Sequence, residues 1–185
     1  VKSANLVGSI SKNGIPNVAI FSSVFHLGSN PALLGFIIRP ANNFGQYQQP
    51  EKLIPFSFAN LHVGGNIEIY GDGKNIRHWL HVEDTCTAVE KVYKNGVSGE
   101  AYNIGSGNYF NNLEISNMIL SALKLETNRL EFVEDRPGHD FRYAVNFDKI
   151  KKIGWSPNTN FEDQLLATLE WYTKNEEWWM KSFNS

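Results

Sequence analysis

Hydrophobic positions along the chain follow two alternating patterns. Segments that are continuously apolar or apolar at every second position predict short strands at 33–38, 67–69, 101–104, 130–133 and 143–145. Segments with apolar positions three and four residues apart predict helices at 51–63, 81–93, 112–123, 148–153 and 161–174. Asn111 and Glu114 form a capping-box pattern at the start of the third helix. Short strands that alternate with helices are typical of an α/β fold.

The first 36 residues give a weaker pattern. Lys12–Ile20 reads as a helix end, a Gly-Pro turn and the start of a strand. Residues 21–36 then mix apolar and small polar residues without a clear period until the apolar run at 33–38. We therefore expect three parts: a poorly matching segment at 1–36, the main body at 37–179 and a tail at 180–185. Trp171, Trp178 and Trp179 are expected to pack on the body.

Composition and charge narrow the class of protein. The 185 residues are 42% hydrophobic and 19% charged, with a net charge of −2, so neither nucleic acid nor an anionic membrane is an expected partner. The one cysteine, Cys86, lies in a helical pattern and is expected in the core. No apolar run is long enough for a membrane helix and no signal peptide is recognisable, so we expect a cytoplasmic protein.

Polar residues that follow predicted strands are candidates for ligand binding. Asn42 and Asn43 lie between Pro40 and Pro50, in a loop that either presents the amides to a ligand or uses them to cap the next helix. Lys52 and Arg77 are cations far apart in the chain that suit a diphosphate, although Lys52 alone is typical of a solvated helix residue. The segment 135–140, Asp-Arg-Pro-Gly-His-Asp, holds Arg136 and His139 on a turn. The histidines have no metal-ligand spacing, so no metal site is expected.

Several blocks in one order carry a resemblance to a known family. They are Arg39-Pro40-x-Asn42-Asn43-Phe44-Gly45, Pro50-Glu51-Lys52-Leu53-Ile54-Pro55, Ile69–Gly73, Ile76–Trp79, Val82-Glu83-Asp84, Tyr102–Gly105, Asp135–Asp140 and Gly154-Trp155-x-Pro157. The chain resembles the nucleotide-sugar 4,6-dehydratases of the extended short-chain dehydrogenase/reductase superfamily, and among them the dTDP-glucose 4,6-dehydratases. Epimerases of UDP-sugars, GDP-mannose dehydratases and UDP-glucuronate decarboxylases are related alternatives.

The resemblance implies a fold and a set of binding residues. The fold would be a partial Rossmann-like α/β sheet, its last strands and helices, with the small substrate-binding lobe. NAD would be the cofactor and a nucleotide sugar the substrate, with Asn42 beside the nicotinamide. The implied substrate-binding residues are Asn43, Lys52, Leu53, Glu68, Ile69, Tyr70, Arg77, Asn112, Asp135, Arg136 and His139. Glu68 replaces the proline usual in the family, which leaves the choice of base open, and Asn112 also reads as a capping residue.

The family's catalytic residues are expected before Arg39. No tyrosine precedes Tyr47, no Asp or Glu precedes Glu51, and the glycines form no G-x-x-G-x-x-G. The Tyr-x-x-x-Lys pair and the Asp-Glu pair of the family are therefore missing from that region, and no catalytic residue is assigned. Two hypotheses remain. In the first, the chain is part of a dehydratase and supplies substrate-binding groups. In the second, the chain is not catalytic and either binds a nucleotide sugar or associates with a full-length relative or a second copy.

Overall fold

The computed structural model describes residues 5–10, 16–21 and 37–183. Strands β1 (Asn5–Ile10) and β2 (Pro16–Phe21) pair as an antiparallel hairpin. The predicted strand at 33–38 is confirmed where it is described, as β3 (Ile37–Pro40). The rest of that prediction, at 33–36, and the aperiodic residues 22–32 lie outside the described residues. The helix end predicted in the first part of Lys12–Ile20 also lies outside the described residues. The strand predicted to start in the last part of that segment corresponds to β2.

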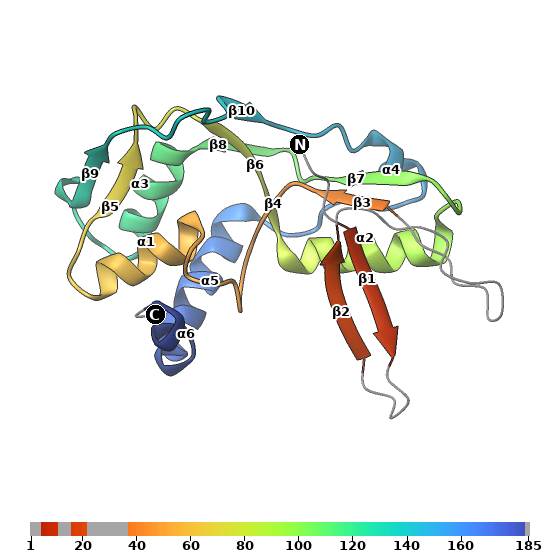
Figure 1. Ribbon diagram of the computed structural model, residues 1–185, viewed down its shortest axis with the longest axis horizontal. Helices are drawn as coiled ribbons and strands as arrows, with labels where there is room; N and C mark the ends of the chain where they lie inside the picture. Colours follow the sequence, from red (N-terminus) through yellow and green to blue (C-terminus); the bar gives the residue numbers. More distant parts are fainter. Residues whose placement is uncertain (1–4, 11–15, 22–36, 184–185) are drawn as a thin grey trace.

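Parallel pairing organises the strands of the main body. Strand β3 pairs with β7 (Ala101–Ile104), and β5 (Ile67–Tyr70) pairs with β9 (Leu130–Val133), both in parallel. Strand β6 (Ile76–His81) joins the two regions. One edge of β6 carries β8 (Asn108–Asn111), antiparallel, and the other carries β10 (Arg142–Tyr143) followed by β4 (Asn42–Phe44), both parallel. Figure 1 shows β6 running between the two ends of the body.

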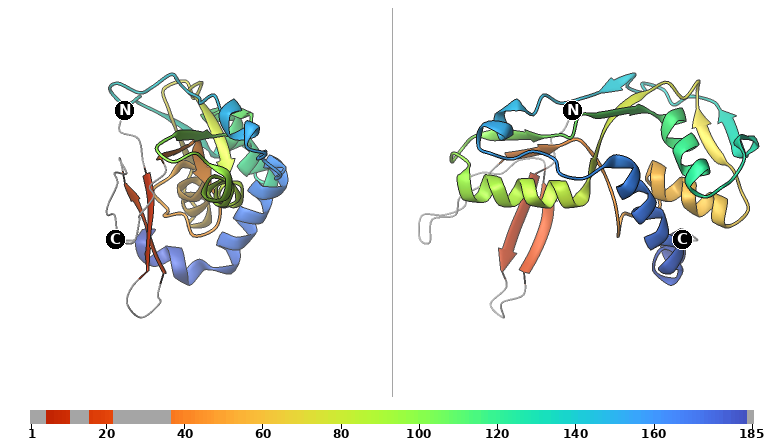
Figure 2. Two further views of the ribbon diagram at one scale, coloured as in Figure 1. Left: turned by 90° about the vertical axis from the view of Figure 1, so that its right-hand side faces the viewer. Right: turned by 180° about the vertical axis from the view of Figure 1, so that it is seen from behind.

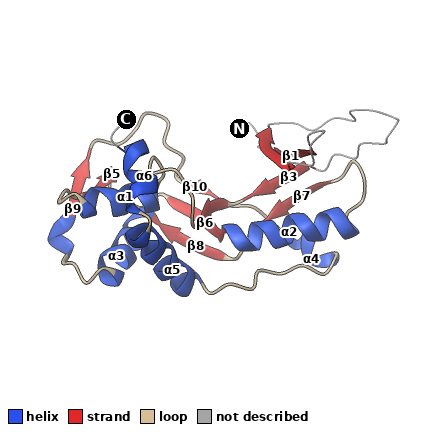
Figure 3. Ribbon diagram, turned by 90° about the horizontal axis from the view of Figure 1, so that it is seen from below, coloured by secondary structure: helices blue, strands red, loops and turns tan. Residues whose placement is uncertain are grey.

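Helices cover these strands in two groups. At one end lie α1 (Leu53–His62), α3 (Asn112–Ala122), α5 (Phe161–Lys174) and α6 (Glu176–Phe183). At the other end lie α2 (Val82–Asn95) and the short α4 (Asp148–Lys152), beside β3 and β7 (Figure 3). A single 3₁₀ turn, Thr127–Arg129, precedes β9. Seen from behind, the same division is clear (Figure 2).

Each group of helices encloses its own hydrophobic core. The first core packs β4, β5 and β6 against α1, α3, α5 and α6, and the largest side chain buried in it is that of Trp179. The second core packs β3, β6 and β7 against α2 and α4. Neighbouring residues of β6 separate the two, because Trp79 points into the first core and Leu80 into the second, as strand alternation requires.

Most of the predicted elements are confirmed, and three predictions are corrected. The two asparagines lie on β4 and not in an irregular loop, because their backbone pairs with β6. Strands β6 and β8 were not predicted, since Arg and His interrupt the apolar pattern of β6 and asparagines flank the two aromatic residues of β8. Cys86 was expected in the core but is exposed, because α2 turns that face towards solvent.

The aromatic residues near the carboxyl end pack as expected only in part. Trp179 is fully buried, whereas Trp178 remains 36% exposed. The ring of Trp171 lies 4.5 Å from that of Tyr47, which is itself exposed. The tail predicted at 180–185 begins inside α6, so its first residues are helical.

Candidate functional site

Parallel strands β5 and β9 bring two predicted binding segments to one edge. Tyr70 ends β5 and pairs with Val133 of β9, and the N–H of Gly71 donates to the Val133 carbonyl at 3.0 Å. Asp135 follows two residues after β9, and a Cβ on Gly71 would lie 3.0 Å from its carboxylate. The carboxyl ends of parallel strands are where open α/β sheets place ligand-binding groups. Segments 68–70 and 135–139 are therefore neighbours at one edge of the sheet, and their part in ligand binding stays a prediction.

Arg136 is held by three side chains of this edge. Its guanidinium carbon lies 5.1 Å from the centre of the Tyr70 ring. Its Nη2 lies 3.0 Å from Nε2 of His139, whose Nδ1 lies 2.7 Å from Oδ1 of Asp135. The hydrogen bond from His139 is the main reason that the pKa of Asp135 lies below its ordinary value. We refer to Tyr70, Arg77, Asp135, Arg136 and His139 as the Tyr70–Arg136 cluster.

Arg77 joins this cluster through the pairing of β6 with β10. Arg77 stands opposite Tyr143 in that ladder, and its Nη1 donates to the Ile76 carbonyl at 2.8 Å. Burial lowers the pKa of Arg77, the Asp140 charge opposes that shift, and the positive charge of Arg136 adds to it. Two guanidinium groups from distant segments therefore act on each other.

Neither guanidinium group forms a direct ion pair. None of the ion pairs formed by residues 5–10, 16–21 and 37–183 includes an arginine, although the charge of Asp140 acts on Arg77 and that of Arg136 acts on Asp135. Arginine presents a planar fork of donors that matches phosphate oxygens, and it keeps its charge at all ordinary pH values. Two arginines that form no direct ion pair keep their donors for a ligand and are suited to a diphosphate.

Asn112 borders the same region. It is the first residue of α3, and the capping box is made by Asn111 and Glu114, so Asn112 is not the N-cap residue. The N–H of the next residue, Leu113, donates to the Gly73 carbonyl at 3.1 Å. This bond holds the start of α3 against the turn that follows β5.

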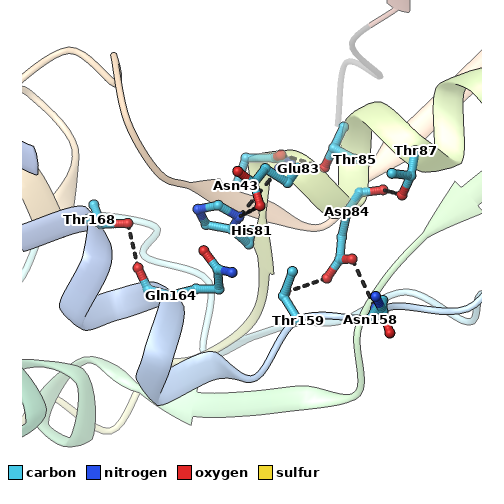
Figure 4. A network of polar contacts seen from close by, with 10 residues as sticks. All are labelled: Asn43, His81, Glu83, Asp84, Thr85, Thr87, Asn158, Thr159, Gln164 and Thr168. Atoms are coloured by element: carbon cyan, nitrogen blue, oxygen red, sulfur yellow. Dashed lines mark hydrogen bonds and ion pairs between the residues drawn. The ribbon is translucent and has the colours of Figure 1, made fainter.

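Asn42 and Asn43 lie farther along β6. Asn43 stands opposite Leu80, three positions beyond Arg77, which corresponds to about 10 Å along a strand. Its Oδ1 accepts a bond from Thr85 Oγ1 at 2.5 Å (Figure 4). Its Nδ2 donates to the Ala41 carbonyl at 3.0 Å. One amide N–H and one oxygen lone pair remain available on Asn43. Asn42 pairs with Trp79, so strand alternation turns it to the opposite face.

The other predicted residues differ in how much they offer to a ligand. The Lys52 side chain is 61% exposed and pairs with Glu51 at 2.8 Å, with no described contact to the Tyr70–Arg136 cluster. Glu68 is half-buried and accepts a bond from the Tyr70 hydroxyl at 3.4 Å. Ile69 is buried in the first core and Leu53 packs against that core, so neither side chain is free for a ligand.

Sequence reasoning did not single out a second polar network. Asp84 is buried, and its carboxylate accepts bonds from the Asn158 N–H at 2.9 Å and from Thr159 Oγ1 at 2.5 Å (Figure 4). His81 caps α2, with Nδ1 accepting from the Glu83 N–H at 3.4 Å. The signal for this network was the Val82-Glu83-Asp84 block, which directly follows His81.

His78 is a further buried group that the sequence did not mark. Its Nε2 accepts bonds from the backbone N–H groups of Ser106 and Gly107 at 2.9 and 2.8 Å, and burial lowers its pKa to about 4. Its Nδ1 has no partner within the described residues. His78 therefore holds the turn after β7 as a neutral imidazole.

The glycines at strand ends do not form a cradle for a dinucleotide. A Cβ on Gly45 would lie 2.6 Å from Cγ1 of Val82, and a Cβ on Gly73 would lie 2.7 Å from Cγ2 of Ile69. Both glycines make room for the protein's own side chains. A pyrophosphate needs open backbone at a helix N-terminus, so the described residues do not fit NAD by themselves.

A Tyr-x-x-x-Lys spacing does occur at Tyr70 and Lys74, but not on a helix. It spans the end of β5 and the Gly71–Gly73 turn, and Lys74 Nζ pairs with Asp72 at 3.2 Å. Tyr70 already contacts Arg136. This pair therefore does not replace the one expected before Arg39.

The fold defines an α/β protein of the extended short-chain dehydrogenase/reductase type. The chain belongs to the NAD dependent epimerase/dehydratase family, whose model matches residues 5–105. That match includes part of the segment before residue 37.

Individual relatives agree with this family. The chain is 47% identical over 141 residues to the low-salt glycan biosynthesis protein Agl12 of Haloferax volcanii, covering 76% of this chain and 46% of that protein. It is 44% identical over 144 residues to dTDP-glucose 4,6-dehydratase of Streptomyces niveus, covering 77% and 43%. The crystal structure of DesIV, a dTDP-glucose 4,6-dehydratase from Streptomyces venezuelae with NAD and TYD bound, matches with a TM-score of 0.77 and 40% identity, covering 80% and 46%. The chain thus spans about half the length of the relatives it matches.

Proposed function

We propose that this chain forms the nucleotide-sugar-binding part of a dTDP-glucose 4,6-dehydratase-like lyase. The observation that carries the proposal is the stacking of Arg136 on Tyr70 at the carboxyl ends of β5 and β9, where the Arg136 guanidinium forms no ion pair among the described residues and its charge acts on Arg77. In this proposal the two guanidinium groups bind the diphosphate. The similarity to dehydratases at more than 40% identity supports the choice of a dTDP-sugar over other diphosphates.

The remaining predicted residues take positions along the ligand. Asn43 stands opposite Leu80, on the face of β6 that alternates with the face of Arg77, so its assignment to the sugar rests on the resemblance and not on a shared face. Asn112 and segment 68–70 border the cluster on the side of α3 and would receive the nucleoside. Lys52 would approach the ligand only by turning away from Glu51. Asp135 would influence the ligand indirectly, through the other residues of the Tyr70–Arg136 cluster.

The described residues supply binding and orientation but no redox chemistry. NAD, when bound to members of this family, accepts and returns a hydride, and the groups that hold it are not formed by the described residues. Asn42 is the one residue here that we assign next to it. We propose that such a chain meets its substrate in the cytoplasm. Further protein would complete its site, either a second copy in a homodimer or a full-length relative.

Isothermal titration of the 185-residue chain with dTDP-glucose tests the binding proposal. We expect saturable heat with dTDP-glucose and with dTDP, and little with glucose alone. The matched control is Arg77→Gln/Arg136→Gln, which removes both cations. Absence of heat with both dTDP-glucose and dTDP would contradict the proposal.

The alternative is a chain that binds no nucleotide and only associates with another protein. The exposed Tyr47 and Trp178 favour it, because large aromatic side chains are enriched at protein interfaces. Light scattering, alone and mixed with a full-length dehydratase, separates the two hypotheses. A complex that forms without any nucleotide binding would support the alternative.

A further inference from the structure

His139 has both ring nitrogens occupied inside the protein. Its side chain is only 5% exposed, whereas the Asp135 carboxylate beside it is 44% exposed. Nδ1 lies 2.7 Å from Asp135 Oδ1, and Nε2 lies 3.0 Å from Arg136 Nη2. A residue in this position has neither the exposure nor a free nitrogen for direct contact with a ligand.

The chemistry of the two partners fixes which nitrogen carries the proton. Arg136 can only donate, so Nε2 must accept from it. An ionised Asp135 can only accept, so Nδ1 must donate to it. One neutral tautomer, protonated on Nδ1, satisfies both contacts.

We propose that His139 is a positioning residue that directs Arg136 towards the diphosphate, through a relay from Asp135 to His139 to Arg136. The identity of the ligand in this proposal rests on the proposed function, whereas the contacts of the relay do not depend on it. Tyr70 supports the guanidinium from its face and His139 from its edge, which together set both its plane and its direction. Orientation fixed before binding removes part of the entropic cost of holding a long side chain.

Nitrogen NMR of the histidine rings tests the relay without any ligand. At pH 8 we expect His139 to be the Nδ1–H tautomer, with Nε2 shifted as an acceptor, and Arg136→Gln should perturb that signal. An Nε2–H tautomer, or rapid exchange between tautomers, would overturn the proposal whether or not the chain binds nucleotide.

Titration with dTDP at pH 7 and at pH 8 tests the consequence for binding. His139→Gln should bind about as tightly as the wild type, because glutamine can still accept from Arg136. His139→Leu cannot accept and should bind about tenfold more weakly at both pH values, with its thermal melt showing whether it is folded.

The outcomes separate the two proposals. Equal affinity of the wild type, His139→Gln and His139→Leu at both pH values would overturn the relay and leave the proposed function standing. No binding by the wild type, together with the expected tautomer, would overturn the proposed function and leave the relay standing.

Discussion

The guanidinium of Arg136 stacks on the ring of Tyr70, with 5.1 Å from its central carbon to the ring centre. The two residues come from the end of β5 and from the loop after β9, strands that pair in parallel with Tyr70 opposite Val133. This contact converts two separate sequence blocks into one binding edge. It also explains why Arg136, although exposed, has a defined direction.

Removing the ring of Tyr70 should weaken nucleotide binding. A cation–π contact at an exposed site contributes about 0.5–1 kcal/mol, so Tyr70→Leu should lower the affinity for dTDP by about two- to fivefold. Tyr70→Phe is the matched control, because it keeps the ring and removes only the hydroxyl that bonds to Glu68 at 3.4 Å. Titration calorimetry measures both, and equal losses would show that the ring is not the important part.

Each of the two arginines should contribute strongly to affinity. Hydrogen bonds to charged groups contribute about 1.5–3 kcal/mol, so Arg77→Gln and Arg136→Gln should each weaken dTDP binding by about tenfold or more. The control is Arg142→Gln, whose guanidinium stacks on Tyr109 at 5.6 Å, away from the cluster. Binding that is weakened as much by the control as by the two variants would argue against a specific site.

The buried His78 should make stability depend on pH. Its folded-state pKa of about 4 lies below the ordinary value of 6.5, so between these values the unfolded chain binds a proton that the folded chain does not. Stability should therefore fall as the pH is lowered from about 6.5 to about 4, and this contribution should level off below that range. His78→Gln keeps an acceptor for Ser106 and Gly107 but does not titrate. Urea unfolding at several pH values should show a shallower acid loss for the variant.

Asp84 should be important for stability rather than for binding. Its buried carboxylate joins α2 to the segment before α5 through Asn158 and Thr159. Asp84→Ala removes both hydrogen bonds, each of which contributes about 0.5–1.5 kcal/mol. Urea unfolding should show this loss, whereas the exposed Asp72→Ala should change stability far less. Unchanged unfolding of Asp84→Ala would contradict the role that we assign to it.

Gly45 should resist substitution because of its neighbours as well as its backbone. It has φ of +143°, and a Cβ there would lie 2.6 Å from Cγ1 of Val82. Gly45→Ala should therefore cost about 1–3 kcal/mol through overpacking, in addition to strain. Gly64→Ala carries strain alone, since φ is +88° and nothing lies within 4 Å. Denaturant unfolding of Gly45→Ala with and without Val82→Ala should show partial rescue in the double variant.

The sequence by itself determined most of the local structure. Helix α5 runs over the residues predicted from its apolar spacing, and Asn111 with Glu114 forms the expected capping box at the start of α3. Both depend on residues three or four positions apart, which contact each other in any helix. The strands at Ile67–Tyr70 and Leu130–Val133 were likewise evident from short apolar runs.

Only the tertiary structure decided what the polar residues contact. The pairing of β5 with β9 brought Tyr70 to Arg136, and the pairing of β6 with β10 brought Arg77 within the influence of the Arg136 charge. The strands β6 and β8 and the exposed position of Cys86 also depended on packing that local pattern does not record. Contacts between residues far apart in the chain follow from strand register and core packing, so a single sequence can suggest the groups but not their arrangement.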